Sequence, residues 1–206
     1  MYDIAMSLTK KVLARMVAQG AGWVFTPSDF ADLGSPPSIG MAMLRLARRG
    51  QLRRLARGFY DLPRKDPLLG ELLPTADAVI DAIRRRDRVL IEPHEAMAAN
   101  MLKLSEQVQG RLIYNTDGPP RRFKIGPAVF ELRHRSRRKL ATPDRTTALV
   151  IAALRGLGRG RVTAEHLAHL SELLSPEDRR KLKDDPAQAP AWMRPHLLKI
   201  AGLGAK

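Results

Sequence analysis

Hydrophobic residues near the start of the chain recur with the spacing of amphipathic helices. Residues 7–19 place their apolar side chains on one face, which predicts a first helix that ends at Gly20. Residues 23–26 form a short strand-like run, and a second helix follows with Thr26 as its cap and Pro27 at its first position. A third helix is expected from about residue 37 to residue 49. Its apolar face holds Ile39, Ala42, Met43, Leu46 and Ala47, and its opposite face holds Ser38, Met41, Arg45 and Arg48.

Two short strands are expected directly after the third helix. They cover residues 51–55 and 59–62, and Gly58 suits the turn between them because glycine tolerates a positive φ. Helix, strand, helix, turn, helix and hairpin is the order of a winged helix-turn-helix. We therefore predict such a DNA-binding domain over residues 1–64.

The remainder of the chain alternates differently and predicts a second domain. Residues 65–74 contain two prolines and no clear period, which indicates a linker. Helices are expected at 75–86 and about 93–104, a small antiparallel sheet over 111–135, and helices at 144–155, 163–174, 176–183 and near 194–201. The fold class predicted is α+β, with a mixed C-terminal domain over residues 75–206.

The charge balance points to an anionic partner. The chain has 206 residues with 36 Lys and Arg against 21 Asp and Glu, a net charge of +15. Such a charge attracts nucleic acid, an acidic membrane surface or an acidic protein. There is no cysteine, no apolar leader at the N-terminus and no apolar stretch long enough to span a bilayer. We expect a cytoplasmic protein without membrane contact.

Two segments concentrate the positive charge. Residues 41–64 hold seven arginines and a single acid, Asp61, and arginine can both read guanine edges and contact phosphates. The alternatives to DNA contact for these arginines are a solvated helix face and a winged helix that binds a protein. In this segment Met41 and Leu44 could touch thymine methyls or pack against the second domain. Residues 121–145 hold nine Lys and Arg against two acids, a candidate second basic surface or a solvated strand face formed by Arg121, Arg122, Lys124, Arg133, Arg135, Arg137 and Arg138.

The sequence shows no pattern typical of catalysis or cofactor binding. His166 and His169 share a helix face, but no Cys or carboxylate completes a metal site, so a surface or capping role is expected. The glycine-rich run at 156–160 lacks the flanking elements of a phosphate loop. Glu92 and Glu95 are expected at the surface of a helix start. We predict no enzyme activity, no cofactor and no metal.

Several segments resemble the AbiEi-type antitoxins, the transcriptional regulators of type IV toxin–antitoxin systems, and their relatives. The likeness covers most of the chain. In the N-terminal part it rests on residues 25–30, 46–54 and 57–60, and in the second part on Leu104-Ser105-Glu106-Gln107-Val108, Tyr114-Asn115-Thr116-Asp117-Gly118-Pro119 and Lys124-Ile125-Gly126.

This resemblance implies an antitoxin that represses its own operon by binding inverted repeats in double-stranded promoter DNA. It also implies a nucleotidyltransferase-like toxin encoded nearby, bound directly or countered without a stable complex. Position by position, Ser38, Arg45 and Arg48 would face bases, and Arg49, Arg53, Arg54 and Arg57 would meet phosphates. Met41 and Leu44 depart from the polar residues expected on the reading helix. The competing interpretations are a protein-binding adaptor that neutralises a partner, and a nucleic-acid enzyme, for which the sequence offers no cluster of acids.

Overall fold

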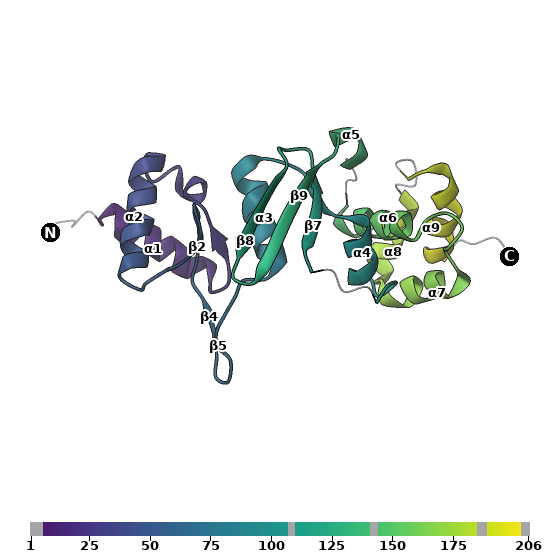
Figure 1. Cartoon of the computed structure of the whole chain (residues 1–206), viewed down its shortest axis with the longest axis horizontal. Coiled ribbons are helices and arrows are strands. Elements are labelled where there is room, and N and C mark those ends of the chain that lie inside the picture. Colours follow the sequence, from purple (N-terminus) through teal and green to yellow (C-terminus); the bar gives the residue numbers. More distant parts are fainter. Residues whose placement is uncertain (1–5, 107–109, 141–143, 185–188, 203–206) are drawn as a thin grey trace. The chain divides into compact units, whose positions relative to one another are not determined.

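The protein consists of two compact units of mixed helix and strand content. The computed structural model describes residues 6–106, 110–140, 144–184 and 189–202. Contacts group residues 1–89 with 124–128 as the first unit and residues 90–123 with 129–206 as the second. Helices and small sheets occur in both (Figure 1), which confirms the predicted α+β class. Gln107 and Val108, part of one family-like segment, lie outside the described residues.

The first unit begins with the elements expected from the hydrophobic pattern. They are α1 (Leu8–Gln19), β1 (Val24–Phe25), the 3₁₀ helix η1 (Pro27–Phe30), α2 (Pro36–Arg48), β2 (Arg53–Ala56) and β3 (Phe59–Asp61). Thr26 and Asp29 form a capping box at η1, with Pro27 in its first turn. The three strands form one antiparallel sheet in the order β1-β3-β2.

The core of this unit lies between its helices and the small sheet. The buried face of α2 consists of Ile39, Ala42, Met43 and Leu46, as its periodicity predicts. These side chains pack with Val12 and Met16 of α1 and with Phe25, Phe30, Leu52 and Tyr60. The burial leaves the opposite face of α2 to solvent, where Met41 and Arg45 are exposed.

The expected linker at 65–74 differs from what the structure shows. The chain forms a second hairpin there, with β4 (Arg64–Asp66) paired to β5 (Gly70–Leu72). Its tip is ordered by the Asp66 carboxylate, which accepts hydrogen bonds from the N–H groups of Leu68 and Leu69, both at 2.9 Å.

Helix α3 (Ala76–Asp87) belongs to the first unit, whereas the sequence placed it in the second domain. Its Arg85 guanidinium lies 3.9 Å from the centroid of the Trp23 ring and donates to Asp29 at 2.9 Å and to the Val24 carbonyl at 2.8 Å. Arg86 stacks on Phe59 at 4.5 Å. These contacts move the boundary between the compact units to residues 89 and 90.

The second unit combines a small sheet with a helical bundle. Its strands and first helices are β6 (Ile91–Pro93), α4 (Glu95–Met101), β7 (Leu112–Thr116), β8 (Arg121–Ile125), β9 (Ala128–His134) and α5 (Arg137–Leu140), although residues 124–128, which include the end of β8 and the start of β9, group with the first unit. They are followed by α6 (Arg145–Leu157), α7 (Ala164–Leu173), α8 (Pro176–Asp184), the 3₁₀ helix η3 (Ala191–Met193) and α9 (Arg194–Ile200). The helical core buries the apolar faces of α4, α6, α7 and α9 together.

The sheet of this part of the chain is mixed, so the prediction of a small antiparallel sheet is wrong in this respect. Its order is β6-β7-β9-β8, and β7 pairs with β9 in parallel, with Tyr114 opposite Leu132. Strand β8, which follows β7 in the chain, lies at the edge of the sheet. The turn at Gly126 and Pro127 then leads into β9, which lies between β7 and β8. None of the helices in the described ranges has the length and hydrophobicity of a membrane-spanning segment.

Candidate nucleic-acid interface

Helix α2 starts at a serine followed by two prolines. The Ser35 hydroxyl accepts a hydrogen bond from the N–H of Ser38 at 3.4 Å and lies 2.9 Å from the Ser38 hydroxyl. A proline in the first turn costs no hydrogen bond, because the N–H groups of the first turn have no partner within the helix and proline merely lacks one of them. The cap therefore fixes where α2 begins and places Ser38 in the first turn, exposed to solvent.

The exposed face of α2 carries the side chains expected to read bases. Ser38, Met41, Arg45 and Arg48 follow one another at intervals of three and four residues and are all exposed. Met41 keeps 49% of its surface accessible. A hollow of about 460 Å³ lies beside this face, lined by Ser7, Leu8 and Thr9 of the α1 start and by Pro37, Ser38, Met41, Ala42 and Arg45 of α2.

The hairpin after α2 presents two further arginines to solvent. Arg54 lies on β2 and Arg57 at the turn, and both are exposed. Gly58 completes this turn with a φ of +77°, a conformation that glycine adopts without strain. Arg49, the C-terminal cap residue of α2, is exposed as well.

Arg53 does not fit the phosphate contact expected for it. Its guanidinium donates to both carboxylate oxygens of Asp61, at 3.0 and 2.7 Å, and to the Leu72 carbonyl at 2.7 Å. Asp61 is fully buried, and the hydrogen bonds that Arg53 donates to its carboxylate raise the pKa of Arg53. Successive strand residues point to opposite faces, so Arg53 turns inward where Arg54 turns outward.

These positions leave a concentrated positive charge at the end of α2 and on the adjoining hairpin. In the described part of the chain, no ion pair engages Arg45, Arg48, Arg49, Arg54 or Arg57. Asp61, the single acid of residues 41–64, is occupied by Arg53. Five guanidiniums without a carboxylate partner can bind an anionic polymer such as the phosphate backbone of a duplex.

The predicted second basic surface divides into separate groups. Arg121, Arg122 and Arg133 line one hollow, while Arg135 and Arg138 line another. Arg133 is paired with Glu131 at 2.8 Å and Arg137 with Asp117 at 3.3 Å. Lys124 is exposed and groups with the first unit. The seven basic residues predicted to form a second basic surface therefore do not form one continuous surface, and at least two of them are paired with carboxylates.

Glu95 is buried, in contrast to the surface position expected for it. It lies at the start of α4 and accepts a hydrogen bond from Arg135. Burial acts to raise the pKa of Glu95, but a backbone hydrogen bond and Arg135 outweigh it and hold the pKa below its usual value. Sequence reasoning missed this pair because its members lie 40 residues apart.

The two histidines of α7 serve the structure of the helix and its neighbours. His166 Nδ1 accepts a hydrogen bond from the N–H of Thr163 in a capping box, and His169 Nε2 lies 3.0 Å from the Leu102 carbonyl. Among the residues that the structure describes, no three His, Asp or Glu side chains are grouped as metal ligands would be.

The fold is that of a two-unit α+β protein with a group of exposed arginines on α2 and the adjoining hairpin. The chain belongs to the DUF6088 family, a family of unknown function whose model matches residues 8–182. No curated protein matches the chain in sequence. A crystal structure of the Rv2827c protein from Mycobacterium tuberculosis is similar at 18% identity and a TM-score of 0.40, covering 93% of this chain and 78% of that one.

Proposed function

We propose that this protein is a sequence-specific DNA-binding regulator whose first unit acts as a winged helix-turn-helix. In this proposal α2 enters the major groove and the β2–β3 hairpin is the wing that follows the backbone. The order of α1, η1, α2, β2 and β3 supports it. The main supporting observation is the group of five exposed arginines on α2 and the hairpin that no described carboxylate neutralises.

The proposed roles follow the direction of each side chain. Ser38, Arg45 and Arg48 share the exposed face of α2 and would meet base edges, where arginine binds guanine in a bidentate manner. Met41 lies between them and offers an apolar contact for a thymine methyl group. The phosphate contacts would come from Arg49, Arg54 and Arg57, while Arg53 is excluded because Asp61 holds it.

The first experiment measures specificity on the gene's own upstream region. Fluorescence anisotropy with a duplex from that region and with a shuffled duplex of equal length gives both affinities. The expected result is binding at least about 1000-fold tighter to the upstream duplex, the lower end of the usual ratio for specific regulators. Equal affinity for both duplexes would contradict the proposal.

A charge reversal tests which face carries the binding. The double variant R45E/R48E should weaken binding to the upstream duplex by roughly 100-fold or more, since it removes two side chains that would bind bases. The matched control is R159E/R161E, which makes the same change in net charge at two exposed arginines of the second unit. Equal effects of the two double variants would show that overall charge, and not the α2 face, determines binding.

We further propose that the regulator is the cytoplasmic antitoxin of a toxin–antitoxin pair, acting against a nucleotidyltransferase-like toxin encoded beside it. The segments at 104–108 and 114–119, which resemble AbiEi-type antitoxins, support this role. Expression of the neighbouring toxin gene alone should arrest the growth of a host cell, and coexpression of this protein should restore it. Toxicity that the full chain leaves unchanged would contradict the antitoxin role and leave the DNA-binding role intact.

A second candidate, a protein-binding adaptor with incidental DNA binding, is favoured by one observation. The tip of the β4–β5 hairpin presents Leu68 and Leu69 with 94% and 77% of their surfaces exposed. Two adjacent exposed leucines on an ordered turn form a small apolar patch that a partner protein could cover. The variant L68S/L69S separates the functions. If the protein is a regulator, the variant should repress the promoter as strongly as the wild type does. If it is an adaptor, the wild type should repress only weakly, and the variant should fail to neutralise the partner protein.

A further inference from the structure

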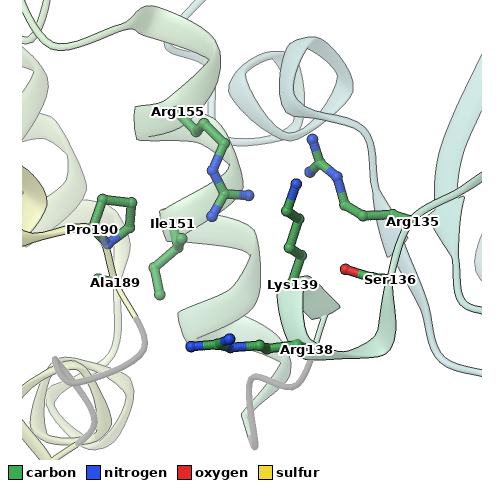
Figure 2. A pocket seen from close by; sticks show the side chains of 8 residues that line it. All are labelled: Arg135, Ser136, Arg138, Lys139, Ile151, Arg155, Ala189 and Pro190. Atoms are coloured by element: carbon green, nitrogen blue, oxygen red, sulfur yellow. The ribbon is translucent and has the colours of Figure 1, made fainter.

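A cavity of about 680 Å³ in the second unit is lined largely by cationic side chains. Arg135 follows β9, Arg138 and Lys139 lie on α5, and Arg155 lies on α6. Figure 2 shows the nitrogen ends of Arg135, Lys139 and Arg155 converging on one side of the cavity, with Arg138 across its other edge. Ser136 adds a hydroxyl group to the same wall.

Most of this positive charge is not neutralised by the described residues. Glu95 is the acid that contacts the group, with an oxygen 2.5 Å from Arg135 and 3.8 Å from Arg155. In the described ranges neither Arg138 nor Lys139 forms an ion pair, and both are exposed. Four cations against one carboxylate leave a net charge of +3 at the cavity.

Helix α6, which carries the cavity residues Ile151 and Arg155, packs closely on the start of α4. A Cβ atom added at Gly156 would lie 2.7 Å from the Glu95 carbonyl oxygen, so glycine at this position lets α6 approach the start of α4 closely. Glu95 in turn fixes the guanidinium of Arg135. A guanidinium oriented before a ligand arrives loses less conformational entropy on binding, and among the cavity cations this applies to Arg135.

The side of the cavity away from Arg135 and Lys139 is largely apolar, with Arg138 at its edge. Ile151, Ala189 and Pro190 line this side (Figure 2), and Ile151 is almost fully buried. A polar, cationic side facing an apolar side suits a ligand with an anionic end and a flat organic end. The volume lies within the usual range of sites for small molecules, about 300–1,000 Å³.

We propose that this cavity is a binding site for a small phosphorylated ligand of the nucleotide class. The phosphates contact Arg138, Lys139 and the free edge of Arg155, while the base and ribose lie against Pro190 and Ile151. Guanidinium and ammonium groups are the side chains that bind phosphate oxygens most strongly. The site goes beyond the proposed DNA-binding function and lies in the other unit, so the two stand or fall separately.

Isothermal titration calorimetry of the full chain tests the site with four separate probes, ATP, GTP, CTP and UTP, and with inorganic triphosphate. At least one nucleoside triphosphate should bind, and about ten-fold tighter than inorganic triphosphate, because burial of a base adds apolar contact. No binding at millimolar concentration, or equal binding of inorganic triphosphate and every nucleotide, overturns the proposal.

A double variant locates the binding. R138Q/K139Q removes two exposed cations without a described partner and should weaken nucleotide binding by about ten-fold for each of the phosphate contacts that it removes. The control R159Q/R161Q, an equal charge change at exposed positions outside the cavity, should bind like the wild type. Thermal unfolding of both variants checks that they fold.

Competition with DNA separates this site from a duplex-binding surface. Random duplex DNA should fail to displace the nucleotide, and R138Q/K139Q should bind the upstream duplex like the wild type. Displacement by the duplex, with parallel decreases of nucleotide and duplex binding in the variant, would show that the cavity serves the phosphate backbone and would overturn the nucleotide site.

Discussion

At the scale of single residues, neighbouring arginines on β2 have opposite surroundings. Arg53 is paired with the fully buried Asp61 and the Leu72 carbonyl, whereas Arg54 is exposed. Breaking a buried ion pair leaves a carboxylate without its partner, while truncating an exposed arginine removes little. The two positions therefore allow a direct comparison of a structural arginine with a proposed DNA-contacting one.

We predict that Arg53→Ala lowers the free energy of unfolding by about 3 kcal/mol, since it leaves Asp61 buried and unpaired. Arg54→Ala should change it by less than about 0.5 kcal/mol. Urea denaturation followed by circular dichroism measures both. Equal stabilities of the two variants would mean that the Arg53–Asp61 pair contributes nothing to the fold.

The acid response of the protein should depend on Glu95. The pKa of this carboxyl is lowered in the folded protein, because its backbone hydrogen bond and Arg135 outweigh the effect of burial. A carboxyl with a lowered folded-state pKa stabilises the fold above the pKa of the unfolded chain, and this contribution is lost as the pH falls through the folded-state pKa.

Glu95→Gln should therefore be less stable than the wild type at neutral pH and lose less stability on acidification. The measurement is the free energy of unfolding at a series of pH values from neutral to below the usual pKa of glutamate. Parallel curves for the two proteins would show that Glu95 does not contribute to the acid response.

At the scale of elements, the packing of α4 on α6 depends on a residue without a side chain. A Cβ at Gly156 would lie 2.7 Å from the Glu95 carbonyl oxygen and 2.9 Å from its carbon, both backbone atoms that cannot rotate away. At Gly40 in α2, by contrast, no atom beyond the adjacent residues and the backbone of the helix itself lies within 4 Å of an added Cβ. The two glycines offer a matched pair within helices.

Gly156→Ala should destabilise the protein by about 1–3 kcal/mol through overpacking, although alanine favours helix. Gly40→Ala should stabilise it by up to about 1 kcal/mol, since only the helix preference changes. Differential scanning calorimetry gives both shifts in Tm. A higher Tm for both variants would contradict the close approach of α4 and α6.

The elements also show what a single sequence can and cannot reveal. The buried face of α2 and the caps at Thr26 and Ser35 follow from local periodicity and side-chain chemistry, and the sequence predicts the face and the Thr26 cap correctly. The parallel pairing of β7 with β9 could not be predicted because strand direction depends on contacts outside either strand. The place of α3 depends on Arg85 meeting Trp23 and Asp29, far away in the sequence.

The candidate sites show the same limit. The exposed arginines of α2 and its hairpin could be predicted because they lie close together in the sequence. The inward turn of Arg53 depends on Asp61 and Leu72, and the cationic cavity gathers Arg135, Lys139 and Arg155 around Glu95. Neither grouping is visible from local pattern.

At the scale of the whole molecule, the net charge of +15 has two proposed roles. In the first unit, arginines of α2 and its hairpin would bind a duplex, and in the second, a cationic cavity would take a small phosphorylated ligand. Since the two sites lie in separate compact units, each can be altered without the other.

The salt dependence of binding to the upstream duplex shows whether the exposed arginines of α2 and its hairpin contact DNA phosphates. Three phosphate contacts, from Arg49, Arg54 and Arg57, predict that log K falls with log salt concentration at a slope of about −3 or steeper, and that Arg54→Gln makes the slope shallower by about 1. A slope near zero, or one that Arg54→Gln leaves unchanged, would contradict the assignment of this arginine face to DNA.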